Sequence, residues 1–139
     1  MRTQEMIEEL KKWMPNFFGV VSSDMFLNHS IFDIEQIRSS DRHDELVLDR
    51  QLFLVLKSME VGSIKAAKHI NRSHCNSSAS LRKIYGYYDQ GNYVKSRILR
   101  HFDSEDSSIE NNRIELPLSL RRLQLYLNGK SIQTIKILK

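Results

Sequence analysis

Hydrophobic residues recur along this chain mostly three or four positions apart, which is the spacing of an α-helix with one buried face. At the N-terminus the pattern predicts a helix that Thr3 caps and that runs to about Met14, where Pro15 stops it. Its apolar positions are Met6, Ile7, Leu10, Trp13 and Met14. The next apolar run, FFGVV at 17–21, is too short for its period to separate a strand from a buried turn.

The middle of the chain predicts a long central helix. A short helix is expected before it, at 33–38, followed by the polar connection SSDRHDE. Apolar residues then cover more than one side of segment 45–61. A helix with so much apolar surface should be buried on several sides. Gly62 can end it, because glycine adopts the left-handed cap conformation without steric cost.

Two further helices follow after very short turns. Ser63 is expected to cap a helix at 64–70, which Asn71 and Arg72 end. Ser73 then caps a helix from 74 to about 85, whose expected inward residues are Ala79, Leu81 and Ile84. So short a second helix is unstable alone in water and must pack between its neighbours. Its small residues Ala66 and Ala67 let two helices approach closely at a steep angle, as a helix-turn-helix requires.

The segment after the third helix has two interpretations. In YGYYDQGNYVKSRIL, at 85–99, the turn signal DQGN between tyrosine-rich flanks predicts a small β-hairpin, which would form a wing. A helix that starts near Asn92 is the competing interpretation. Residues 101–112 are acidic, rich in serine and poor in apolar residues, and are expected to form an exposed linker.

The C-terminal part predicts a pair of helices. Pro117 can open the first, which runs through Leu127 and ends at Asn128 and Gly129; Ser131 would cap a last short helix. The predicted fold is therefore mostly α, a helical domain with a central helix-turn-helix. Its parts are an N-terminal helix and irregular segment that forms a dimer arm or sensory remnant (1–44), the DNA-binding core (45–100), the linker (101–112) and the C-terminal helical pair (113–139).

Charge is distributed unevenly over these parts. The net charge of the chain is +4, but residues 1–61 carry −4, residues 62–100 carry +7, residues 101–112 carry −4 and residues 113–139 carry +5. A basic middle segment beside an acidic front half indicates a polyanion as the partner of the middle segment, although a solvated basic face would show the same pattern.

Several classes of function are disfavoured by what the sequence lacks. The single cysteine, Cys75, rules out an internal disulfide and fits a reducing cytoplasm. His69, His74, Cys75 and His101 lack the paired spacing of zinc ligands, so no metal or other cofactor is expected. Nucleophile and phosphate-loop motifs are also missing, which argues against an enzyme. No apolar run approaches the roughly 20 residues that cross a bilayer, and the N-terminus does not resemble a secretory signal.

The third predicted helix begins with short hydrogen-bonding side chains, and basic residues surround them. Such polar groups contact base edges, and lysine or arginine neutralises phosphates. The candidate base contacts are Ser73, His74, Asn76, Ser77 and Ser80. The candidate phosphate contacts are Lys65, Lys68, Arg72, Arg82 and Lys83.

The stretch GSIKAAKHINRS, at 62–73, resembles the helix-turn-helix of bacterial transcriptional regulators, especially of the LysR type, over residues 52–85. That family has "GS" after its first helix and then an Ala-x-x-Leu-x-x-Ser spacing, which Ala67, Ile70 and Ser73 match. The segment between "GS" and this alanine is one residue shorter here. The resemblance implies that Ser73 opens a recognition helix and that the protein regulates transcription.

A second resemblance lies at 116–139, where LRRLQLYLNGKSIQTIKILK looks like the first two helices of a LuxR-type helix-turn-helix. It also echoes the first unit. A shift of 68 positions places Leu120 on Leu52 and Ser131 on Ser63. The alternative is chance similarity between short leucine-rich helices.

From these observations we expect a cytoplasmic bacterial regulator that binds double-stranded DNA as a homodimer, with the third helix in the major groove. The alternative is a non-enzymatic module that binds another protein, because similar helical triplets also serve in protein docking. RNA binding through the tyrosine group is a weaker alternative.

Overall fold

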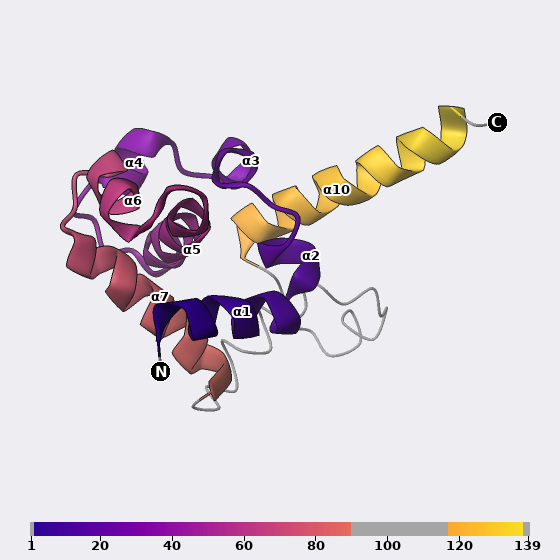
Figure 1. The fold of residues 1–139 in the computed structure, drawn as a ribbon. Helices are drawn as coiled ribbons and strands as arrows, with labels where there is room; N and C mark the ends of the chain where they lie inside the picture. Colours follow the sequence, from indigo (N-terminus) through magenta and orange to yellow (C-terminus); the bar gives the residue numbers. More distant parts are fainter. Residues whose placement is uncertain (1, 90–116, 138–139) are drawn as a thin grey trace.

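The computed structural model describes residues 2–89 and 117–137, and every regular element in these residues is an α-helix (Figure 1). In chain order the helices are α1 (Thr3–Trp13), α2 (Pro15–Phe18), α3 (Ser23–His29), α4 (Ile34–Arg38), α5 (Asp44–Val61), α6 (Ser63–His69), α7 (His74–Asp89) and α10 (Leu118–Ile137). The mostly helical fold class expected from the sequence is thus confirmed.

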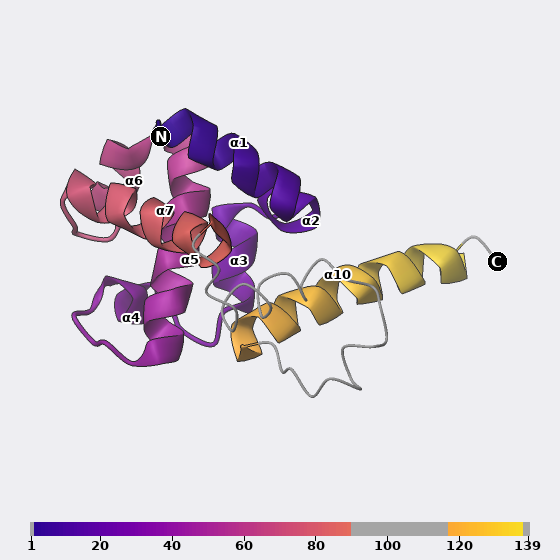
Figure 2. The ribbon, with the colours of Figure 1, turned by 90° about the horizontal axis from the view of Figure 1, so that it is seen from below.

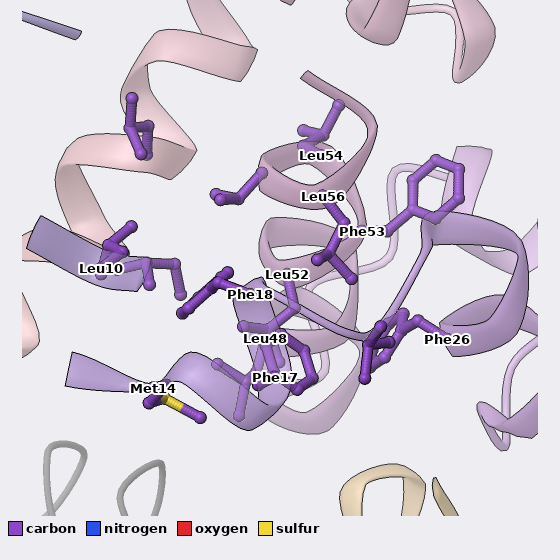
Figure 3. Packing of buried hydrophobic residues seen from close by; sticks show 14 of the residues in the cluster. Leu10, Met14, Phe17, Phe18, Phe26, Leu48, Leu52, Phe53, Leu54 and Leu56 are labelled. Carbon is purple, nitrogen blue, oxygen red and sulfur yellow. The ribbon is translucent and has the colours of Figure 1, made fainter. Parts of the chain in front are cut away.

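Helix α5 is the centre of the fold, as its apolar pattern predicts. Leu52 to Leu56 are five consecutive buried residues, so α5 is covered on every side over this stretch. α3, α4, α6 and α7 all pack against it. Figure 3 shows Phe17 of α2 close to Leu48 and Leu52, and Phe17 meets the ring of Phe26 edge to face at 6.1 Å. Each fully buried side chain of this size stabilises the fold by about 1.5–3 kcal/mol.

The N-terminal segment covers one side of this core. α1 lies along α7, and the ring of Trp13 is 5.1 Å from that of Tyr85. Thr3 is the first helical residue; Arg2 holds the N-cap position and no side chain caps the helix, so the predicted Thr3 cap is wrong. The run at 17–21 forms the end of α2 and a turn, not a strand.

Helix α4 confirms the short helix expected near 33–38. Its start is a capping box, in which Asp33 and Gln36 each accept a hydrogen bond from the other's backbone N–H, both at 2.9 Å. Its end is held by Arg50 of α5, whose Nε donates to the Ile37 carbonyl at 2.8 Å. A cation at this end of a helix is favoured by the helix dipole.

Helix α10 differs from the predicted helical pair. It runs without interruption through Asn128 and Gly129, so the predicted end there and the separate last helix are wrong. Asparagine and glycine weaken a helix by at most about 1 kcal/mol each, and good helix formers flank them on both sides. The turn that a LuxR-type unit needs is therefore absent. Within the described part of the chain, α10 contacts the body over its first turns, and the rest projects away from it (Figures 1 and 2).

Three other expectations fall partly or wholly outside the described residues. Tyr85 to Asp89 continue α7, so this flank of the predicted wing is helical. The remainder of the hairpin, the competing helix near Asn92 and the acidic linker at 101–112 lie outside the described residues. The described residues contain no strand.

A buried carboxylate ties α10 to the core. Asp49 of α5 is 1 % exposed, and Oδ2 of Asp49 accepts hydrogen bonds from the hydroxyls of Ser30, at 2.7 Å, and Ser119. The two serine oxygens in turn accept the backbone N–H groups of Phe32 and Ile31. Burial raises the pKa of the Asp49 carboxyl above its ordinary value of 3.8, while the two serine hydroxyls act in the opposite direction.

The raised pKa of Asp49 makes the stability of the fold depend on pH, and Asp49→Asn should remove this dependence. Because the folded pKa is raised, the contribution of Asp49 to stability is complete below pH 3.8 and is lost as the pH rises through the folded value. The difference in free energy of unfolding between wild type and Asp49→Asn should therefore fall by up to about 1.4 kcal/mol per pH unit in that window. Urea denaturation at several pH values measures it. Asp44→Asn, on the exposed first turn of α5, is the control, and a pH-independent difference for Asp49→Asn would contradict the assignment.

Gly62 separates α5 from α6 with φ of +88° and ψ of 158°, a conformation that is essentially restricted to glycine. Gly62→Ala should therefore lower the free energy of unfolding by about 1–3 kcal/mol, although no atom would clash with the new methyl group. Gly129→Ala, within α10 and equally unobstructed, should cause no loss. Thermal unfolding followed by circular dichroism compares the two, and equal effects would refute a backbone origin.

Candidate nucleic-acid interface

The chain from Gly62 to Asp89 forms two helices, α6 and α7, joined by a tight turn. Asn71 in this turn has φ of +60°, and its N–H donates to the Lys68 carbonyl at 3.1 Å. The next N–H, of Arg72, donates to the Ala67 carbonyl at 2.8 Å. These two bonds constitute a Schellman motif, in which asparagine tolerates the left-handed position. The prediction that Asn71 and Arg72 end the second helix is confirmed.

Small side chains bring α6 and α7 close together on α5. Ala66, Ala67 and Ile70 are 0 % exposed. Across the contact, the hydroxyl of Ser77 donates to the Ser63 carbonyl at 3.0 Å. Ser63 itself is the first residue of α6 and its side chain caps nothing, so the predicted Ser63 cap is wrong. Gly62 occupies the cap position instead.

Helix α7 is rotated relative to the sequence-based expectation. Ser77 is 1 % exposed and Ser80 is 8 % exposed, and both face the interior. Neither can reach a base edge, so these two predicted base contacts are wrong. Ala79, which was expected to face inward, is exposed. The sequence contained a signal for this rotation. Ser77 and Ser80 each precede a buried residue, Leu81 and Ile84, by four positions, so they share its face of the helix.

The other predicted contacts are exposed or half-buried. Ser73 and Asn76 are exposed at the start of α7, where Nδ2 of Asn76 donates to Oγ of Ser73 at 3.1 Å. Arg82 and Lys83 are exposed one to two turns further along α7, and Lys65 and Lys68 are exposed on α6. The prediction for the His74 side chain lies outside what the structure describes.

Arg72 faces a pocket that sequence reasoning missed. The pocket has a volume of about 280 Å³ and is lined by Ser40, Arg42, Arg50, Arg72 and Asn76. Arg50 and Arg72 are half-buried, whereas the other three residues are exposed at the rim. The available signal was the charged pair Asp49–Arg50, which together with Gln51 interrupts the apolar run LVLDRQLFLVL of α5.

Burial and neighbouring positive charges lower the pKa of Arg50 and of His69. Burial, and then the positive charge of Arg72, lower the pKa of Arg50, which Asp41 partly offsets. The pKa of His69 is also lowered, first by burial and then by Lys57 and Arg38. The ring of His69 stacks on Phe53 with a centroid distance of 5.9 Å. Within residues 2–89 and 117–137 no three His, Cys, Asp or Glu side chains are grouped so that they could hold a metal ion.

The chain matches no protein-family model, and neither a curated protein nor a solved structure is significantly similar to it. Among the helices that the structure describes, none combines the length and the apolar character needed to cross a bilayer.

The rotation of α7 can be checked with two substitutions one residue apart. Ser80→Leu adds bulk at a buried position of α7 and should lower the free energy of unfolding by about 1–3 kcal/mol. Ala79→Leu adds bulk on the exposed face and should change it by less than about 0.5 kcal/mol. Chemical denaturation measures both values. A larger loss for Ala79→Leu than for Ser80→Leu would instead support the rotation of α7 that was expected from the sequence.

Proposed function

We propose that this protein is a cytoplasmic, sequence-specific DNA-binding regulator of transcription that reads the major groove with α7. One observation carries the proposal. From Gly62 to Tyr88 the chain has no aspartate or glutamate, but it contains Lys65, Lys68, Arg72, Arg82 and Lys83. None of these five forms an ion pair within the described residues, where Lys12–Glu9 and Arg38–Glu35 are the pairs found. Unneutralised cations on one helical unit favour binding to a polyanion.

The exposed face of α7 gives this proposal its geometry. Asn76, Ala79 and Lys83 follow one another at intervals of three and four residues on the exposed side. The amide of asparagine can pair with adenine, and the methyl group of alanine can contact that of thymine. Ser77 and Ser80 no longer belong to the contact set, so Ala79 replaces them. Lys65 and Lys68 of α6 would neutralise backbone phosphates.

The N-terminal half of α7 is also the part of this helix that DNA can reach more easily. α1 covers the C-terminal half of α7 through the contact of Trp13 with Tyr85, and Figure 2 shows the start of α7 at the edge of the molecule opposite α10. Helix-turn-helix proteins contact bases mainly with the N-terminal residues of the recognition helix. In a homodimer, two such units would read half-sites about one helical turn apart.

A protein-docking module is the second candidate function. The observation that favours it is the exposed apolar surface of α10, where Leu125 is 63 % and Tyr126 is 42 % exposed. Such side chains are typical of contact surfaces between proteins. Binding to DNA separates the two candidates, because docking through α10 does not require the basic residues of α6 and α7.

Fluorescence anisotropy with a random duplex over a salt series tests the proposal. If all five basic residues contact phosphates, log K should fall with log salt with a slope of roughly −4.5. Lys68→Ala should reduce this slope by about 1. Lys11→Ala, which removes the same charge from an exposed position on α1, is the matched control and should leave the slope unchanged. An absence of binding even at low salt would favour the docking module.

Once an operator is selected, Asn76→Ala should weaken operator binding by about 1–3 kcal/mol and spare random DNA. The physical reason is that an amide facing base edges contributes to discrimination, whereas a lysine at a phosphate contributes equally to all sequences. Competition between operator and random duplex measures the ratio. An equal loss on both duplexes would place Asn76 outside the groove.

A further inference from the structure

The arginine pocket beside the start of α7 holds an arrangement of charges that the α6–α7 unit does not require. It is built from three places in the chain: the loop after α4 supplies Ser40 and Arg42, α5 supplies Arg50, and the turn between α6 and α7 with the first turn of α7 supplies Arg72 and Asn76. Three guanidinium groups line this pocket, whose volume is about 280 Å³.

Two of these guanidinium groups converge on one atom. Nη2 of Arg50 donates to the Ser39 carbonyl oxygen at 2.8 Å, and Nη2 of Arg72 donates to the same oxygen. Arg50 is further fixed by its bonds to the Ile37 carbonyl, at 2.8 Å, and the Asp41 carbonyl, at 3.0 Å. Three hydrogen bonds thereby fix the guanidinium group of Arg50, and one places the guanidinium group of Arg72 beside it.

The described part of the chain supplies little negative charge to balance them. No carboxylate lies within ion-pair distance of Arg42, Arg50 or Arg72 there, and the nearby Asp41 uses Oδ1 to accept the N–H of His43 at 3.2 Å. Arg38, the next basic side chain, is already paired with Glu35 and donates to the His69 carbonyl. The pocket thus contains three cations and is adjacent to one carboxylate. A bound anion would lower the repulsion between Arg50 and Arg72.

Unused donors remain for such an anion. Among the described residues, Nη1 of Arg50 has no hydrogen-bond acceptor, Arg72 uses only one of its nitrogens, and Arg42 has no partner. The fork of Arg42 can donate two parallel hydrogen bonds to an oxyanion, Arg50 adds Nη1, and Arg72 adds its remaining N–H groups. The amide of Asn76 and the hydroxyl of Ser40 complete a lining that has no apolar side chain. A tetrahedral anion with several oxygens satisfies more of these donors than a halide ion can.

From this geometry we propose that the pocket binds a phosphate group, with Arg42, Arg50 and Arg72 as its ligands. The site goes beyond the proposed function, because a phosphate monoester would bind there without any DNA. The same chemistry is present in a free phosphorylated molecule and in the backbone of a nucleic acid, and the experiment separates these two sources.

Arg42 distinguishes binding from a structural role. Arg50 and Arg72 also hold the loop after α4 against the core, so their removal would disturb the fold whether or not an anion binds. Arg42 is exposed and makes no hydrogen bond within the described residues, so a purely structural cluster gains nothing from it. Arg42→Ala therefore affects anion binding alone, and Arg72→Lys keeps the charge while removing the fork.

Titration of the full chain by ¹H–¹⁵N NMR tests the site, with potassium phosphate against potassium chloride at equal ionic strength and pH. Phosphate should shift the Nε–H signals of Arg50 and Arg72 in a saturable manner that chloride does not reproduce. Arg42→Ala should weaken the phosphate Kd by about tenfold, and Arg72→Lys by a similar factor. Lys11→Ala should leave it unchanged. Equal responses to the two salts, or a phosphate Kd that Arg42→Ala does not change, would overturn the proposal.

Two more titrations identify the source of the phosphate. If glycerol phosphate binds more tightly than inorganic phosphate, with glycerol as the neutral control, the pocket takes a small phosphorylated molecule. If instead a duplex competes with phosphate and Arg42→Ala weakens duplex binding, the occupant is the nucleic-acid backbone. Both results support a phosphate site. Because the phosphate titration contains no DNA, its outcome is independent of whether α7 reads the major groove.

Discussion

The burial of α5 on every side is the constraint on which the rest of the structure depends. A helix with five consecutive buried residues cannot be stable unless other elements cover each of its faces. Helices α3, α4, α6 and α7 pack directly on α5, Phe17 of α2 lies close to Leu48 and Leu52, and α1 packs against α7. The positions of the basic side chains on α6 and α7 therefore follow from the packing of apolar side chains that never contact a partner.

Two adjacent charged residues interrupt the apolar run of α5, and each connects it to a different part of the molecule. Asp49 faces Ser30 and Ser119, so it joins α5 to α3 and α10. Arg50 faces the loop after α4, where its hydrogen bonds replace those that the end of α4 lacks. Because buried charges are costly unless they are hydrogen-bonded, each residue fixes the register of the segments it touches. The arginine pocket and the attachment of α10 thus both originate in one dipeptide.

Local signals in the sequence were sufficient for some elements and insufficient for others. The bounds of α5 and the end of α6 were predictable, because Gly62 and Asn71 each act on their own few residues. The rotation of α7 was missed because alanine was counted as an inward residue, although the larger Leu81 and Ile84 decide which face is buried. The continuity of α10 was missed because a local helix breaker was given more weight than its helical neighbours. The charged pair Asp49–Arg50 indicated a polar site on α5, but the composition of the pocket could not be predicted, since tertiary packing alone brings Arg42 and Arg72 to Arg50.

The hydrogen bonds that attach α10 also bear on how the molecule comes apart. They join residues 70 to 89 positions apart along the chain, whereas α5, α6 and α7 are consecutive and contact one another locally. Contacts between distant segments require a large loss of chain entropy before they form. Among the residues that the structure describes, the contacts of α10 with the core also lie in its first turns. We therefore expect α5, α6 and α7 to assemble first during folding, and α10 to dock last and to be released first, in a local opening that leaves the central helices intact.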